Sequence, residues 1–237
     1  MTPTTGAARE VESTAAVLVA ARRVLVTGFA AAGAGTATLA CDLAEALGAA
    51  VDPGGEEEAR VAGPTLARIG GVTADAEELR DRADLVVLWF CPAEQAAAFR
   101  EAFVTPATAA GRPRTVLDVG PVAAGGGRVA VQRTDAVDLA RLLHVAVAGI
   151  ACPAPPATLA AARDAINAAL DAAGCVAFVT CHDDPLGLEP WSLVGLVRAL
   201  AHKKPAFEVP LVTGGAAAAV CTWRYGAAGA IARADRD

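Results

Sequence analysis

The sequence predicts an α/β fold with a mostly parallel, twisted sheet and helices on both faces. Two observations carry this prediction. Short apolar runs bounded by turn residues alternate with longer stretches of helical periodicity, which is the pattern of βαβ units. The apolar runs are continuous, as is typical of parallel strands that are buried on both faces. Hydrophobic residues make up 54% of the 237 residues, which is enough for a sizeable core.

The first 90 residues alternate regularly between the two patterns. Ser13 or Thr14 can cap the first helix, because a hydroxyl accepts hydrogen bonds from the free amides of a helix start. Further on, three leucines spaced four apart form one helical stripe, which Gly48 closes. The predicted elements are a solvated tail at 1–11, a helix at 13–21, a strand at 24–28, a helix at 35–47, a strand at 50–52, a polar turn at 53–58, a helix capped by Thr73 at 73–82 and a strand at 85–90.

The rest of the chain continues the alternation. Pro92 suits the first turn of a helix, and the proline-rich stretch 152–156 is the one plausible internal linker. The predicted elements are a helix at 92–104, a strand at 115–119, a glycine turn at 125–127, a strand at 129–131, a helix capped by Thr134 at 135–147, a helix at 157–173, a strand at 175–180, a helix at 189–200 and a strand at 207–212. We therefore expect one α/β half at 12–150 and a second at 151–237, on the same or an adjacent sheet.

Charge and composition exclude several classes of partner. The formal net charge of −6 argues against a nucleic-acid groove, which needs clustered Lys and Arg. Lysine occurs only at Lys203 and Lys204, so no polybasic membrane patch is expected. No apolar run reaches the roughly 18–20 residues of a membrane-spanning helix. The first residues also lack the apolar core of a secretory signal, so we expect a cytoplasmic protein.

The segment Gly28–Thr36 follows a predicted strand and opens a predicted helix, which is the context of a phosphate-binding loop. A Walker loop needs lysine after its second glycine, where this chain has Ala34. A dinucleotide fingerprint needs a third glycine, where this chain has Thr38. Asp52 is a possible ribose ligand at a generic strand end. A tight strand-to-helix turn is therefore the favoured interpretation, with nucleotide binding as the alternative.

The segment Cys181-His182-Asp183-Asp184 follows another predicted strand and contains three residue types that ligate zinc. Adjacent residues on one loop rarely converge on one ion, so a turn capped by aspartate is the competing interpretation. His144 lies in an apolar helix, and His202 lies in the last turn of another. Neither has a nucleophile or acid partner in a recognisable motif. The residues thus predict no catalytic, cofactor-binding or metal site.

The cysteines have no CxxC spacing and are expected to be free, mostly buried thiols in a reducing compartment. They are Cys41, Cys91, Cys152, Cys175, Cys181 and Cys221.

Four segments in order resemble the B subunit family of formylmethanofuran dehydrogenases. They are Ala21-Arg-Arg-Val-Leu-Val-Thr-Gly28, Ala40-Cys-Asp-Leu-Ala-Glu-Ala-Leu-Gly-Ala-Ala-Val-Asp52, Arg82-Ala-Asp-Leu-Val-Val-Leu-Trp89 and Cys221-Thr-Trp-Arg-Tyr-Gly226. The resemblance implies a Rossmann-like fold derived from molybdopterin oxidoreductases. Redox-active members also carry a [4Fe–4S] cluster motif and a metal-ligating cysteine or selenocysteine, and this chain has no such spacing.

This departure makes the chain most similar to the B subunit of the bacterial formyltransferase/hydrolase complex. The resemblance implies a structural subunit without cofactors, in a complex that converts formyl-tetrahydromethanopterin to formate. The implied partners are an amidohydrolase-like subunit, a formyltransferase subunit and a β-helix subunit. Trp191 and Trp223 are candidate interface anchors, although ordinary core positions explain them equally well. The alternatives are a residual molybdopterin-binding redox subunit and a stand-alone nucleotide-binding protein.

Overall fold

The computed structural model describes residues 5–55, 57–121, 127–151, 154–181, 187–211 and 215–226. The chain folds into two compact units, one of residues 1–67 with 213–237 and the other of residues 68–212. This division differs from the halves 12–150 and 151–237 that we expected from the sequence. The reason is that the C-terminal segment returns to the first unit, while the segment after the proline-rich stretch packs on the second.

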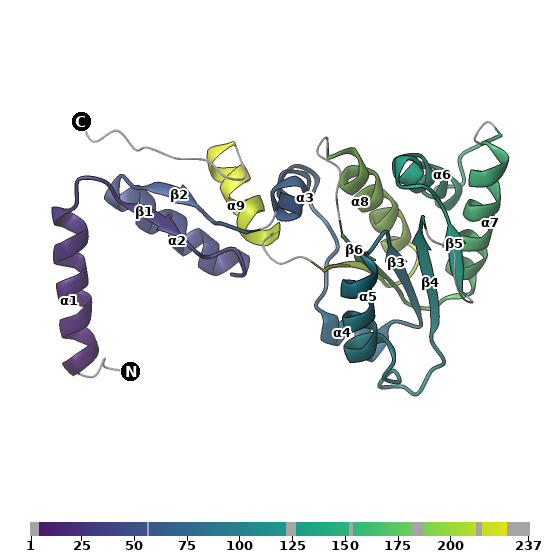
Figure 1. Ribbon diagram of the computed structural model, residues 1–237, viewed down its shortest axis with the longest axis horizontal. Helices are drawn as coiled ribbons and strands as arrows, with labels where there is room; N and C mark the ends of the chain where they lie inside the picture. Colours follow the sequence, from purple (N-terminus) through teal and green to yellow (C-terminus); the bar gives the residue numbers. More distant parts are fainter. Residues whose placement is uncertain are drawn as a thin grey trace. The chain divides into compact units, whose positions relative to one another are not determined.

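The first unit is built around a short parallel strand pair, β1 (Leu25–Thr27) and β2 (Ala50–Asp52). The crossover helix α2 (Ala34–Leu47) connects them and ends at Gly48, which adopts the left-handed conformation with φ 60°. Helix α9 (Gly215–Tyr225) lies beside α2 (Figure 1). The small core between them consists of Cys41, Ala44, Ala49, Val51 and Cys221.

Two helices of this unit differ from the sequence prediction. Helix α1 spans Thr5–Ala20, so residues expected to be a solvated tail are helical. The hydroxyls of Ser13 and Thr14 donate to the carbonyl of Glu10 instead of capping a helix start, as such side chains do inside a helix. Helix α3 (Glu57–Ile69) begins in the predicted polar turn. Its periodicity is hard to detect because Gly63 and Pro64 interrupt it.

The second unit contains a five-stranded sheet in the order β5-β4-β3-β6-β7, and all its pairs are parallel. The strands are β3 (Leu85–Trp89), β4 (Thr115–Gly120), β5 (Arg128–Ala130), β6 (Val176–Thr180) and β7 (Ala206–Pro210). The two central strands, β3 and β6, are buried at every residue. Their continuous apolar runs predict this burial, and the expected α/β fold class is confirmed.

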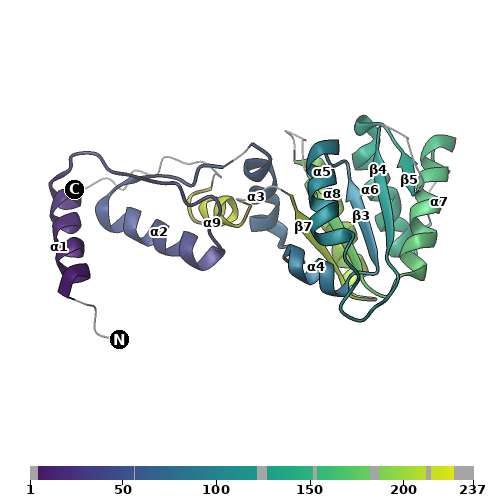
Figure 2. The same ribbon diagram turned by 60° about the horizontal axis from the view of Figure 1, so that its bottom comes forward.

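Helices cover both faces of this sheet (Figures 1 and 2). Helices α4 (Ala76–Arg82) and α5 (Ala93–Phe99), with the π-helical turn Arg100–Val104, pack on one face against Val86 and Leu88. Helices α6 (Ala136–Val147), α7 (Ala157–Ala172) and α8 (Leu188–Ala201) pack on the other face against Leu85, Val87 and Trp89.

Two predicted helix caps of this unit are replaced by neighbouring residues. Asp75, not Thr73, caps α4, because its carboxylate accepts a 2.7 Å hydrogen bond from the amide of Glu78. Thr73 instead forms a β-bridge with Glu208. A 3₁₀ turn leads into α6, whose N-cap residue is Asp135 in place of Thr134. The predicted linker residues 152–153 and the glycine-turn residues 125–126 lie outside the described residues. None of the described helices combines the length and apolarity needed to cross a bilayer.

Candidate functional site

The order of the strands marks one position in the second unit where a ligand site is expected. From β3 the chain moves outward to β4 and β5, then returns to β6 on the other side of β3. The helix after β3 covers one face of the sheet, and the helix after β6 covers the opposite face (Figure 2). In open parallel sheets, ligands bind at such a switch point, in the crevice beyond the carboxyl ends of the strands. We call the surroundings of the carboxyl ends of β3 and β6 the switch-point cluster. Its residues are Trp89, Phe90, Cys91, Arg133, Cys181 and Glu189.

Phe90 follows β3 directly and has a φ of 50°, which is unusual for a bulky residue. Its amide donates a 2.8 Å hydrogen bond to the carbonyl of Val119, so the neighbouring strand holds this backbone in place. Its ring is buried and lies edge-on to Trp89, with 5.4 Å between the ring centroids. The aromatic ring therefore occupies space at the carboxyl end of the central strand.

A partly buried ion pair spans the cluster. The Glu189 carboxylate lies in the first turn of α8 and is almost fully buried. It accepts a 3.0 Å hydrogen bond from the indole N–H of Trp89, and it lies 2.7 Å from the guanidinium of Arg133. Arg133 also lies over the Phe90 ring, 5.1 Å from its centroid. The negative charge of Glu189 is thus paired with the positive charge of Arg133.

Two thiols complete the cluster. The Cys91 sulfur donates to the carbonyl of Val179 at 3.3 Å, and burial raises the pKa of this thiol to about 12. The Cys181 sulfur lies 4.0 Å from the amide oxygen of Gln95. Metal ligation and nucleophilic attack both require a thiolate. The Cys91 thiol therefore suits packing better than chemistry at neutral pH.

A second charged group lies near the carboxyl end of β4. The Asp118 carboxylate is 3.2 Å from the Arg128 guanidinium and 3.5 Å from that of Arg100. Because the carboxylate is only 22% exposed and bridges two elements, it ties β5 and the π-helical turn to the sheet. This carboxylate, too, is held in an internal ion pair.

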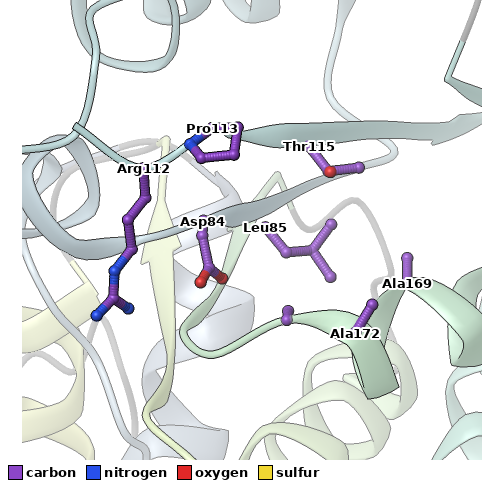
Figure 3. Close-up of a pocket in the computed structure, with 8 residues that line it drawn as sticks. Asp84, Leu85, Arg112, Pro113, Thr115, Ala169 and Ala172 are labelled. Carbon is purple, nitrogen blue, oxygen red and sulfur yellow. The ribbon is translucent and has the colours of Figure 1, made fainter. Parts of the chain in front are cut away.

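A cavity of about 300 Å³ lies at the opposite, amino end of the sheet (Figure 3). Asp84, Leu85 and Thr115 line it beside the end of helix α7. The Asp84 carboxylate accepts hydrogen bonds from the amides of Gly174 and Cys175, at 3.1 and 2.9 Å, so it fixes the turn before β6. The cavity thus lies at the other end of the strands from the switch-point cluster. The Asp84 carboxylate that lines it supports the backbone of the turn.

Neither unit by itself brings four described cysteines together. Cys41 and Cys221 lie in the first unit, and Cys91, Cys175 and Cys181 lie in the second. Cys175 precedes β6 and Cys181 follows it, so their Cα atoms are roughly 20 Å apart along an extended strand. A [4Fe–4S] cluster needs four converging thiolates. Among the described residues no group of three or more His, Cys, Asp and Glu is placed to hold a metal ion.

The structure confirms the strand–turn–helix context of the Gly28–Thr36 segment. Gly28 has a φ of 83°, and Gly33 is the N-cap residue of α2, without a side-chain cap. The Asp52 carboxylate accepts a 3.0 Å hydrogen bond from the amide of Gly54, inside its own turn. The tight-turn interpretation accounts for this geometry, and nucleotide binding remains a prediction.

The other candidate residues are spread over the second unit. Cys181 is buried, and residues 182–184 of the predicted metal segment lie outside the described residues. The half-buried ring of His144 packs against Gly195, where an added Cβ would lie 3.2 Å from it. His202 is the exposed C-cap residue of α8. The five described cysteines are free, and all except Cys91 are buried, as the composition predicts.

Sequence reasoning missed Arg133 and Glu189, the charged pair of the switch-point cluster. They are 56 residues apart, so no local pattern joins them. The available signal was a glutamate next to proline, at the start of an apolar helix that follows a buried strand.

Comparison with solved structures gives a relation of fold. No protein-family model matches the sequence, and no curated protein matches it. In structure, the chain is similar to one chain of the formyltransferase/hydrolase complex (FhcABCD) from Methylorubrum extorquens, solved in complex with methylofuran. The TM-score is 0.60 and the sequence identity is 23%, over 94% of this chain. The match covers 63% of the other chain, so this chain spans less than two thirds of the length of its structural relative.

Proposed function

We propose that this chain is a non-catalytic structural subunit of a formyltransferase/hydrolase complex, corresponding to its B subunit. Such a complex converts formyl-tetrahydromethanopterin to formate in bacterial one-carbon metabolism. The observation that carries the proposal is the similarity of fold, over 94% of this chain, to a chain of a complex of this kind. The order of the sequence motifs at Gly28, Asp52, Trp89 and Gly226 supports the same assignment.

The geometry of the switch-point cluster favours a structural role over catalysis. Glu189 and Arg133 neutralise each other, and the Phe90 ring is buried between Trp89 and the guanidinium. Burial holds the pKa of Cys91 near 12, so its thiol is protonated at neutral pH. Pairing of this kind satisfies polar groups that are buried in the fold, which suits a role in holding the sheet and helices together.

Two exposed tryptophans support a role in assembly. Trp89 is fully buried, but Trp191 is 48% exposed and Trp223 is 83% exposed, which disagrees with the ordinary core interpretation of both. A large aromatic side chain left in water is typical of an interface anchor. Leu39 and Leu43 on the outer side of α2 are 68% and 47% exposed, and they add apolar surface to the first unit.

The test is affinity purification of the full chain from its host, followed by elemental analysis. We expect a formyltransferase and a zinc-bearing amidohydrolase to co-purify, without molybdenum, tungsten or an iron–sulfur cluster. Trp223→Ala or Trp191→Ala should weaken assembly by tenfold or more if the residue is an anchor. Urea unfolding of each variant in isolation is the control for folding. A chain that purifies alone from its host would refute the proposal.

Two other functions predict different results in the same preparation. A residual pterin-binding redox subunit predicts stoichiometric molybdenum or tungsten. A nucleotide-binding protein predicts micromolar ADP or NAD binding at the Gly28–Thr36 turn. Gly35→Asp would abolish that binding, because it places a negative charge at the start of α2.

A further inference from the structure

The β1–β2 pair has one covered face and one open face. Val26 and Val51 lie opposite each other and belong to the small core under α2 and α9. On the other face, Leu25 is 57% exposed and Thr27 is also exposed. Parallel sheets are nearly always covered on both faces, and an isolated two-stranded sheet is only marginally stable in water. Leu25 and Thr27 share this face with the half-buried Ala50 and Asp52 of β2, so the open face lacks the cover that a parallel pair usually has.

Helix α1 in the same unit presents unused apolar surface. From Arg9 to Ala20, every side chain except the half-buried Leu18 is exposed. Val11, Val17 and Val19 are 68%, 69% and 68% exposed. An isolated helix of this length is marginal in water, and valine has only modest helix propensity. This helix therefore needs a packing surface too.

The apolar residues of α1 lie mainly on one side. Val11, Ala15, Leu18 and Val19 follow the i, i+4, i+7, i+8 spacing and share one helix face. Val17 projects from a different face, on the same side as Glu10. The chain thus offers one apolar stripe for packing, and one valine of equal exposure outside that stripe.

The connection between α1 and β1 suits packing of the helix on the strand that follows it. Only residues 21–24 separate them, and the chain bends at Arg22 and Arg23. Connections of this kind usually have roughly 2–6 residues. A 16-residue helix is about 24 Å long, whereas a three-residue strand spans about 10 Å. Helix α1 is therefore long enough to cross both strands.

We infer that α1 is a strap that closes over the open face of the β1–β2 sheet. Its stripe of Val11, Ala15, Leu18 and Val19 covers Leu25 and Thr27. Because α2 already covers the other face, closure gives the first unit a helix–sheet–helix arrangement, which is the usual solution for a parallel sheet. The inference concerns the free chain and does not depend on the proposed complex.

Hydrogen exchange of the full chain, read by mass spectrometry over β1 and β2, tests the strap. Val11→Gln removes an apolar contact inside the stripe, and Val17→Gln is the matched control outside it. Glutamine is uncharged and a good helix former, so neither the helix dipole nor helix propensity separates the two variants. We expect Val11→Gln to accelerate exchange in β1 and β2 about tenfold. Val17→Gln should leave it within about twofold, as expected for an exposed substitution.

A second matched pair identifies the surface that α1 covers. Leu25→Gln should accelerate exchange in β1 and β2, whereas Leu39→Gln, on the exposed side of α2, should not. Protection of β3 and β6 in the same samples shows that the second unit remains folded. Equal effects of the two valine variants would overturn the inference. A stronger effect of Leu39→Gln than of Leu25→Gln would also overturn it. The same holds if protection of β1 and β2 is lost when the chain is diluted, or if it appears only when partner subunits are added.

Discussion

Gly63 gives the sharpest test of how the first unit is assembled. This glycine lies within α3 and is buried against α9. A Cβ added at Gly63 would lie 2.5 Å from the Cβ of Ala218, 2.9 Å from its carbonyl carbon and 3.0 Å from the amide nitrogen of Ala219. Two of these three atoms belong to the α9 backbone, so no side-chain rotation relieves the contact. Gly63→Ala therefore forces the two helices apart.

The magnitude follows from two opposing effects. Replacing glycine by alanine inside a helix normally stabilises it by about 1 kcal/mol. Overpacking a close contact costs about 1–3 kcal/mol, and a backbone contact that must open by roughly 1 Å belongs at the upper end. We therefore expect Gly63→Ala to lower the free energy of unfolding of the first unit by about 1–2 kcal/mol.

Hydrogen exchange in α2 and α9 measures this change without assuming that the two units unfold together. Gly35→Ala is the matched control, because Gly35 also lies in a helix but has nothing within 4 Å of an added Cβ. It should leave exchange unchanged or slow it slightly, because Gly35 lies in the first turn of α2 and not in its interior. If both variants slow exchange equally, α3 and α9 are not packed as described, and the reasoning fails.

Two further predictions concern the second unit. The Arg114 guanidinium donates to several carbonyls that end α4 and the π-helical turn, including those of Ala83 and Phe103. Arg114→Lys should cost about 3 kcal/mol in urea unfolding, and Arg112→Lys, at an exposed position, less than about 0.5 kcal/mol. Burial raises the pKa of Cys91 from 9.0 to about 12, so the unfolded chain releases this proton first as the pH rises. The free energy of unfolding should thus fall by about 1.4 kcal/mol between pH 8 and 10, and Cys91→Ala should remove that part of the decline.

The sequence predicts the sheet of the second unit well because its strands are uninterrupted apolar runs. Short apolar runs of this kind are typical of parallel strands that are buried on both faces, as Leu85–Trp89 and Val176–Thr180 are. Helix α9 is harder to predict, since Gly215–Tyr225 is mostly small residues and alanine does not mark a buried face. Its return to the first unit rests on packing against α2 and on approaches as close as that of Gly63 to Ala218. Local patterns carry no signal for such a contact.

The switch-point cluster was unpredictable for a different reason. Arg133 and Glu189 are ordinary charged residues in the sequence, and only the crossing of the chain from one side of β3 to the other brings them together. The two thiols are similar: the sequence places each of them directly after a predicted strand, but it does not show that these two strands are neighbours in the sheet. Strand order decides which loops meet, and long-range packing sets strand order.

Phe90 connects the fold to the proposed role. A glycine would adopt this positive φ without strain, whereas in a phenylalanine the same backbone conformation is destabilising by about 1–3 kcal/mol. Burial of the ring stabilises the fold by about 1.5–3 kcal/mol, and its edge contact with Trp89 adds about 0.5–1.5 kcal/mol. The strained residue is therefore stable only because its ring fills the end of the sheet. At the position where a sheet of this order usually receives a ligand, this chain has a buried phenylalanine ring and an internal ion pair, and this arrangement is the reason why we propose a structural role.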